Sequence, residues 1–470
     1  MAVALLGVAQ ALALVAASGE PPGALLAAVL ISASLGGAAL LWVACERRFE
    51  RMPVAAVLGL ALVLRLIAAQ ASPLLEDDHY RYLWDGLRTA TGFDPYRLPP
   101  AAFFGNTALA AQWQDILGGI NNPEIPTIYG PVLQWLFALA YWIAPGQLGA
   151  LQSLLLAADM ALLGVLVRQG TGTRWLLAYA LHPLVLKEAI ASAHPDGLVA
   201  LALVLALIAW QQRAAARVGV MLGLAVGVKV AALVVVPLLL LAPQSSQGTA
   251  PTLAGAARWA LRLSASLGIT LAMLYAPFIL SGGSDASALG VFGSRWRFNP
   301  LLYRAVEMLA PAAAARLLAA ALIVAGIAAL CWQWQCQARR AADHGSTRPL
   351  PPVDLALVLL LLLSPVVNPW YWLWALALSV FYGRSWVVAG GVVATVSYLN
   401  STVLFEAGGW GAPSNVAAPY SVPWPLTMIQ LAVLVGAFAA GRARRRPLAP
   451  TRSARSGVGL PSLETQEKPP

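Results

Sequence analysis

The chain has 470 residues, of which 59% are hydrophobic and only 11% are charged, and its formal net charge is +10. Soluble domains carry a charged fraction of about 25%, so this composition excludes a soluble globular domain. Apolar stretches of roughly 20 residues, the length that crosses a bilayer as a helix, recur along the whole chain. The sequence therefore predicts an all-α protein with many transmembrane helices.

The apolar stretches predict about 12 or 13 transmembrane helices. The first stretch has no basic flank before it, so it is interpreted as a span and not as a signal peptide. Two later stretches are candidates for broken helices, since Lys229 and Pro237 interrupt one and Ser364–Trp370 interrupts the other. The candidate spans lie near residues 2–18, 23–45, 53–71, 128–145, 148–167, 174–191, 196–212, 218–242, 258–280, 309–335, 353–380, 384–402 and 424–441.

Clusters of arginine indicate which loops face the cytoplasm. They include Arg47, Arg48 and Arg51 and the run after Gly441. This orientation puts residues 72–127, the longest polar stretch between spans, on the outer face. The loop 168–174 is inconsistent: its arginines favour the inside, but counting spans from 72–127 puts it outside. Either one hairpin near 128–167 is misassigned, or this loop is an exception.

The chain is interpreted as one helical membrane domain, residues 1–441, with a catalytic outer loop at 72–127. Residues 442–470 form a basic tail, which we expect to be disordered and cytoplasmic, near anionic lipids. Nucleic-acid binding is the alternative for such a tail, but no aromatic residues alternate with its arginines.

Three consecutive acids, Glu76, Asp77 and Asp78, follow the third expected span. Charge beside the bilayer is energetically costly, so it is usually functional. Crowded carboxylates shift each other's pKa values apart, which suits one of them to accept a proton near neutral pH. The alternative is an acidic loop end that is simply solvated.

An amphipathic helix in the outer interface is expected over residues 78–91. Asp78, Arg81 and Asp85 would share one face of it and neutralise each other, while Tyr80 lies on a neighbouring position. The rigid segment 123–131, which contains Tyr129, leads into the next span. It either sets the direction of that helix or contacts a ligand.

At these residues the sequence resembles the GT-C superfamily of multi-span glycosyltransferases, and most closely the bacterial polyprenol-phosphate-mannose-dependent mannosyltransferases. That family carries acids after an early span, then an aromatic residue and a later Asp, as Asp77, Tyr80 and Asp85 do here. Further similar motifs are His182–Glu188 with His194–Gly197, Gly223–Lys229, Ser364–Trp374 and Tyr129–Pro131. The likeness covers about residues 70–380, and none of these motifs distinguishes mannose from glucose or arabinose.

The resemblance implies transfer of a hexose, with mannose favoured, from a polyprenyl phosphate. Asp77 would be the base that deprotonates the acceptor hydroxyl, and Asp78 the second candidate. Glu76 would tune their pKa values or bind a divalent cation such as Mg or Mn, and metal use is left open. No other cofactor is expected.

The departing phosphate needs a cationic clamp. Its candidates are Lys187, Lys229, Arg295 and Arg297. Lys229 lies among Val and Ala residues, where a lone charge usually marks a ligand or partner; the alternative is a cytoplasmic turn between two short helices. Arg295 and Arg297 could equally anchor the chain at the interface.

Other substrate contacts have structural alternatives. His194 and Asp196 could bind hydroxyls, or Asp196 could cap a helix. Asn368, Trp370 and Tyr371 could line a groove for sugar or isoprenoid, or belong to an aromatic belt.

The sequence thus predicts a multi-pass enzyme of the plasma (inner) membrane with an extracytoplasmic active site. Nucleotide sugars are absent from that side, so the donor must cross the bilayer linked to lipid. Its partners would be a polyprenyl-phosphate sugar, a glycolipid or polysaccharide acceptor, and the bilayer itself. The rival is a transporter or flippase of lipid-linked saccharides, a class that tends to show inverted repeats. No repeat is visible in this sequence, and a purely structural scaffold would leave the acids unexplained.

Overall fold

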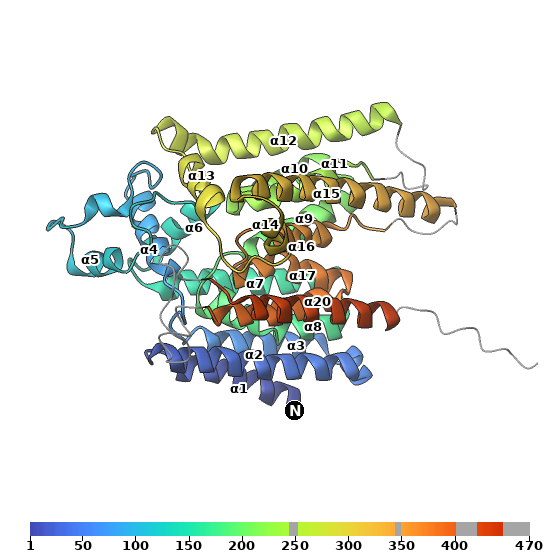
Figure 1. The fold of residues 1–470 in the computed structure, drawn as a ribbon, viewed down its shortest axis with the longest axis horizontal. Coiled ribbons are helices and arrows are strands. Elements are labelled where there is room, and N and C mark those ends of the chain that lie inside the picture. Colours follow the sequence, from blue (N-terminus) through green and yellow to red (C-terminus); the bar gives the residue numbers. More distant parts are fainter. Residues whose placement is uncertain (244–251, 344–348, 401–420, 445–470) are drawn as a thin grey trace, which may run out of the picture.

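The computed structural model describes residues 1–243, 252–343, 349–400 and 421–444. Within these ranges the chain is helical and forms no strand beyond one isolated bridge between Phe298 and Val366. Most helices run side by side along one direction, and the segment that contains α4 (Asp78–Ala90) and α5 (Ala111–Gly118) projects from one end of the bundle (Figure 1). The predicted all-α membrane class is confirmed.

Among the described residues, five helices are long and apolar enough to cross a membrane alone, and these make the chain a multi-pass membrane protein. They are α2 (Pro22–Cys45), α7 (Leu148–Arg168), α12 (Leu253–Leu280), α15 (Ala312–Asp343) and α20 (Trp424–Arg444). In α12 and α15 only 11% and 17% of the most apolar window is buried, so these helices present side chains to lipid. The C-terminal ends of α2, α15 and α20 lie at the end of the bundle opposite α5 (Figure 1).

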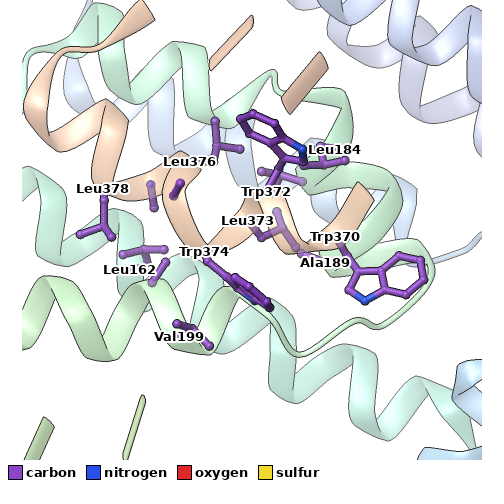
Figure 2. Packing of buried hydrophobic residues seen from close by; sticks show 14 of the residues in the cluster. Leu162, Leu184, Ala189, Val199, Trp370, Trp372, Leu373, Trp374, Leu376 and Leu378 are labelled. Carbon is purple, nitrogen blue, oxygen red and sulfur yellow. The ribbon is translucent and has the colours of Figure 1, made fainter. Parts of the chain in front are cut away.

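The remaining spans are assembled from shorter helices that pack in the interior. They are α1 (Ala2–Ala16), α3 (Val54–Ala68), α8 (Thr173–Ala180), the π-helix η3 (Val185–Ala191), α9 (Gly197–Gln211), α18 (Ser385–Ala394) and the 3-10 helix η6 (Thr395–Tyr398). Figure 2 shows this core, in which Leu373 and Trp374 pack among Leu162, Ala189 and Val199. The core places η3 and the start of α9 next to the acids that follow α3.

The outer loop, named for its predicted side, is residues 72–127 and contains the expected helix α4 at Asp78–Ala90. A 3-10 turn, η2 (Pro100–Phe103), and helix α5 (Ala111–Gly118) follow it. Trp84 is only 2% exposed and packs with Ile116, Leu117 and Ile120 in a small core of their own. The loop is therefore a folded unit that holds α4 in a fixed place.

The expected span at 128–145 is wrong. Helix α6 (Pro131–Ile143) has 13 residues and is about 20 Å long. It begins beside the acids, where the Tyr129 hydroxyl donates to Asp78, and ends beside α5, where Gln112 Nε2 donates to the Pro145 carbonyl at 3.4 Å. Both ends of α6 thus lie at the outer loop, because the helix packs along α4 and does not cross.

This return of α6 resolves the inconsistent loop at 168–174. Helix α7 starts at the outer loop and runs to the other end of the bundle. There the Thr173 hydroxyl donates to the carbonyls of Phe49 and Glu50, both at 2.9 Å, and Arg174 pairs with Glu50 at 3.1 Å. The loop therefore lies against the basic turn η1 (Arg47–Arg51), on the side that its arginines favour.

The predicted break at Lys229 is confirmed, but residues 218–242 form a hairpin and not one span. Helix α10 (Ala215–Val228) ends at Lys229, whose backbone is extended, and η4 (Val230–Val235) and α11 (Val236–Leu240) follow. Trp210, near the end of α9, donates its indole N–H to the Leu241 carbonyl at 3.0 Å. The chain has therefore turned back by residue 241, with Lys229 at the tip.

Residues 353–380 form a second hairpin, again broken where predicted. Helix α16 (Val353–Leu363) leads to a tip at 364–368, and η5 (Pro369–Trp372) and α17 (Leu373–Tyr382) return. Arg384 then pairs with Asp354 at 2.8 Å. The tip is held by Phe298, whose N–H donates to Pro365 at 3.0 Å and whose carbonyl accepts from Val367 at 2.8 Å. Between the hairpins, α13 (Ala286–Arg295) and α14 (Tyr303–Leu309) connect α12 to α15.

Candidate active site

Of the three consecutive acids, Asp77 and Asp78 share one partner, and Glu76 has others. Asn121 Nδ2 donates to Asp77 Oδ1 and, at 3.2 Å, to Asp78 Oδ1. The Tyr129 hydroxyl donates to the other oxygen of Asp78 at 3.0 Å. Asp77 is exposed, whereas Glu76 turns inward and its side chain is 10% exposed. Asp77 and Asp78 thus converge on Asn121, while Glu76 points away from them into the core.

Their pKa values lie apart, as predicted, but mainly for other reasons than mutual crowding. Burial raises the pKa of Glu76 to about 7, with the nearby charge of Lys187 opposing the shift. Burial also acts to raise the pKa of Asp78, but contact with His194 outweighs it and holds the pKa at about 2. Enclosure by neighbouring groups and the charge of Asp78 raise the pKa of Asp77. Asp77 therefore combines exposure with increased basicity.

His194 lies behind Asp78, in the turn between η3 and α9. Its Nε2 is 3.6 Å from Asp78 Oδ2, and its Nδ1 is 3.2 Å from Glu188 Oε2. The ring stacks on Trp370 with centroids 4.0 Å apart. Burial lowers the pKa of His194, but the two carboxylates overcome this and raise it to about 9, so the ring is a cation at neutral pH.

Lys229 reaches the same site from the tip of its hairpin. Its Nζ lies 5.0 Å from the ring centroid of Tyr129 and 5.5 Å from that of Tyr371, both within range of cation–π attraction. Asp196 Oδ1 is 3.9 Å away and also accepts the Trp374 indole N–H at 2.6 Å. Asp196 precedes α9 but makes no side-chain cap, so the capping alternative is wrong.

A contact between backbones fixes the spacing of this site. Gly130 precedes α6, and a Cβ atom there would lie 2.2 Å from the Gly227 carbonyl oxygen in α10. Only glycine permits this approach. The segment that carries Tyr129 and the hairpin that carries Lys229 are therefore in direct contact.

Lys187 lies in a different environment. Its Nζ is 3.2 Å from Glu76 Oε1, 3.2 Å from Glu188 Oε2, and in contact with the Tyr398 hydroxyl. Tyr398 donates to Glu188 Oε1 at 2.6 Å and also touches Glu76. We call Glu76, Lys187, Glu188 and Tyr398 the buried cluster. A phenol has one proton, so Tyr398 can donate to only one of these two carboxylates at a time.

Burial raises the pKa of Asp85 and the charge of Arg81 opposes this rise, as their helical spacing predicts, but Arg81 makes its direct contacts elsewhere. Its guanidinium donates to the backbone carbonyls of Asn121, Asn122 and Ile125, at 3.0 to 3.3 Å, and no ion pair joins it to a carboxylate of α4 among the described residues. It fixes the loop that presents Asn121. Asp85 is buried at 1% exposure, and burial raises its pKa to about 6.

The other predicted residues are divided between this site and its surroundings. Asn368 precedes η5, whose Trp370 and Tyr371 face His194 and Lys229. Tyr80 packs over Gly119 of the outer loop. Arg297 makes a bidentate pair with Glu307 at 2.7 to 3.0 Å, and Arg295 is exposed at the end of α13. Neither arginine contacts the acids.

The donor set does not fit a resident divalent cation. Such an ion prefers about six oxygen ligands, yet Glu76 faces an ammonium group and Asp78 faces an imidazolium group. Across the described ranges, no three His, Cys, Asp or Glu side chains are grouped to hold a metal. The metal role considered for Glu76 therefore has no support in its contacts.

Sequence reasoning missed Asn121, Glu188, Trp374 and Tyr398 as site residues. Glu188 stood inside a recognised motif, next to Lys187, and that position was a usable signal. Tyr398 is an uncharged residue 322 positions from Glu76, and nothing local marked it.

A comparison with known protein families identifies the family of this chain. Residues 3–245, about half of the chain, match the family model for alpha-(1→6)-mannopyranosyltransferase, N-terminal domain, of the MptA/B family. The chain belongs to this family of membrane mannosyltransferases, which use polyprenol-phosphate-mannose as donor. The predicted family and the predicted enzyme class are confirmed, and the transporter alternative is set aside. No curated protein and no solved structure matches the chain.

Proposed function

We propose that this enzyme transfers mannose from polyprenol-phosphate-mannose to a hydroxyl of a mannose-bearing glycolipid or polysaccharide on the extracytoplasmic face. Asp77 is the general base and Lys229 is the cation that faces the departing phosphate. The observation that carries the proposal is the position of Tyr129, which bonds Asp78 beside the base and lies under the lysine.

The assignment of the base follows from exposure and basicity. A general base needs access to the acceptor and a pKa that is not far below the working pH. Asp77 is exposed and its pKa is raised, whereas Asp78 is also bound by Tyr129 and His194 and is too weak a base at a pKa of about 2. Asp78 instead orders the groups around the site.

The proposed transfer forms one bond to C1 of mannose and breaks another. The acceptor hydroxyl gives its proton to Asp77 while its oxygen forms a bond to C1 of mannose. The bond from C1 to the phosphate oxygen breaks, and the polyprenyl phosphate leaves with the electron pair. Lys229 stabilises the charge that develops on this phosphate, an effect that is strong where water is excluded.

The base is tested by transfer of labelled mannose from purified polyprenol-phosphate-mannose. Asp77→Asn should lower kcat by about 10²- to 10⁴-fold, the usual contribution of a general base. Asp115→Asn is the matched control, because Asp115 is an exposed acid of the same outer loop, on α5. Wild-type activity in Asp77→Asn would remove Asp77 from the mechanism.

The side of the membrane is tested by labelling of single cysteines in intact cells. A cysteine at the exposed position 106 of the outer loop should react with an impermeant maleimide. The native Cys45, exposed at the opposite end of the bundle, is the control and should not react. The reverse pattern would put the acids in the cytoplasm and contradict the proposal.

A further inference from the structure

Two turns of backbone aim the groups of the site, and both have an unfavourable conformation. Leu75, immediately before Glu76, has a φ angle of 61°, and Ala193, immediately before His194, has a φ angle of 57°. Residues with a Cβ atom are disfavoured in this left-handed region. Such strain persists only where the surrounding structure imposes it, so something must hold each turn.

The side chains of the buried cluster link the two turns. On one side Glu76, which follows Leu75, contacts Lys187 at 3.2 Å. On the other side Glu188 binds the residue that follows Ala193: its carbonyl accepts the His194 N–H at 2.9 Å, and its carboxylate lies 3.2 Å from His194 Nδ1. Lys187 and Glu188 are neighbours in η3 and contact each other at 3.2 Å.

Tyr398 joins these contacts at one point. Its hydroxyl touches Glu76, Lys187 and Glu188, and the residue is 3% exposed. It comes from η6, far along the chain from α3 and η3. π-Helices such as η3 occur frequently at functional sites, and here the π-helix carries both charged members of the cluster into the core.

We propose that the buried cluster is a positioning device, in which Tyr398 locks the two left-handed turns at Leu75 and Ala193 and thereby aims Asp77, Asp78 and His194 at the substrates. The proposal rests on the function proposed above. Tyr398, Lys187 and Glu188 are positioning residues that act through the acids and His194, with no contact to the reacting atoms.

The test first removes the Tyr398 hydroxyl and then relieves the backbone strain at Leu75. Tyr398→Phe should lower kcat about 10-fold, since misplacement of reacting groups reduces rate strongly, while the donor KM changes less than about twofold because the lysine hairpin is untouched. Adding Leu75→Gly should restore at least half of the lost kcat, because glycine adopts φ of 61° without a steric penalty. Leu75→Ala, which loses the side chain but keeps the penalty, is the matched control and should restore nothing.

Two outcomes would overturn the positioning proposal: wild-type kcat in Tyr398→Phe, or equal effects of Gly and Ala at position 75. If Tyr398→Phe does not accumulate, Glu76→Gln carries the same comparison, because it keeps the shape but removes the charge that faces Lys187. Asp77→Asn is measured alongside. An inactive Asp77→Asn with an unaffected Tyr398→Phe would reject positioning and leave the base in place, whereas an active Asp77→Asn would reject the base itself.

Discussion

The surroundings of the two intramembrane lysines differ, although the sequence suggested one role for both. Lys187 is 2% exposed, and its ammonium group contacts two carboxylates and a phenol. Lys229 is 14% exposed, lies over two aromatic rings, and has its nearest carboxylate at 3.9 Å. The charge of Lys187 is already neutralised by neighbouring carboxylates, whereas Lys229 can still bind an anionic ligand. The number of partners thus separates a structural cation from a ligand-binding one.

The largest effect is expected on stability, from removal of the Lys187 charge. Lys187→Met leaves Glu76 and Glu188 without their cation and should lower the free energy of unfolding by about 3–5 kcal/mol, as broken buried pairs do. Thermal unfolding in detergent measures this, with Lys187→Arg as the charge-preserving control. An unchanged unfolding midpoint in Lys187→Met would show that the buried cluster does not depend on its charge.

His194 lies between the two regions and should make stability depend on pH. Its pKa is raised from 6.5 to about 9, so its contribution is fully present below pH 6.5 and is lost as pH rises through 9. A shift of this size corresponds to about 3 kcal/mol. His194→Gln should flatten the fall in unfolding midpoint over that window. His79→Gln is the control, because burial lowers the pKa of His79 to about 4 and its titration lies below the window.

Substitution of Lys229 should affect binding of the donor more than stability of the fold. Lys229→Met should raise the donor KM by about 10- to 100-fold, the loss of roughly one charge-assisted hydrogen bond to phosphate. Its unfolding midpoint should stay close to that of the wild type. Lys229→Arg keeps the charge and should recover part of the affinity. Unchanged donor affinity in Lys229→Met would make Lys229 a structural residue like Lys187.

The smallest effect is expected from the arginines of the connector between α13 and α14. Arg295→Gln should change donor KM less than about twofold, because an exposed charge away from the acids is screened by solvent. Arg297→Gln loses its exposed pair with Glu307 and should lower stability by no more than about 1 kcal/mol. A tenfold rise in KM for either variant would return it to the phosphate clamp.

Much of the site could be predicted because intramembrane charge is rare and costly. A lone Lys229 in an apolar stretch predicted a broken helix, and the helix ends there. The structure also brings Asp78 and Lys229 to the two sides of Tyr129, and the function predicted for these residues stays a prediction. The resemblance then added the aromatic segment around Trp370. These features are local, and a single sequence shows them directly.

Other features depend on tertiary contacts that no local pattern records. Residues 128–145 have the length and hydropathy of a span, and only packing of α6 along α4 shows that the helix returns to the same side. Gln134, buried at the centre of this packing with its amide near Asp85, was a weak signal. Tyr398 and Asn121 serve residues that are remote in sequence, so their roles follow from the fold alone.

The glycine at position 130 has a consequence for how the enzyme can change. With the Gly227 oxygen occupying the space of a side chain, any larger residue would act as a wedge between two rigid bodies. The distance between the segment that carries Tyr129 and the hairpin that carries Lys229 is therefore set by main chain, and the side chains around them can vary without altering that distance. Substitutions of those side chains would change the contacts to a substrate, while the distance between the acids and Lys229 stays the same.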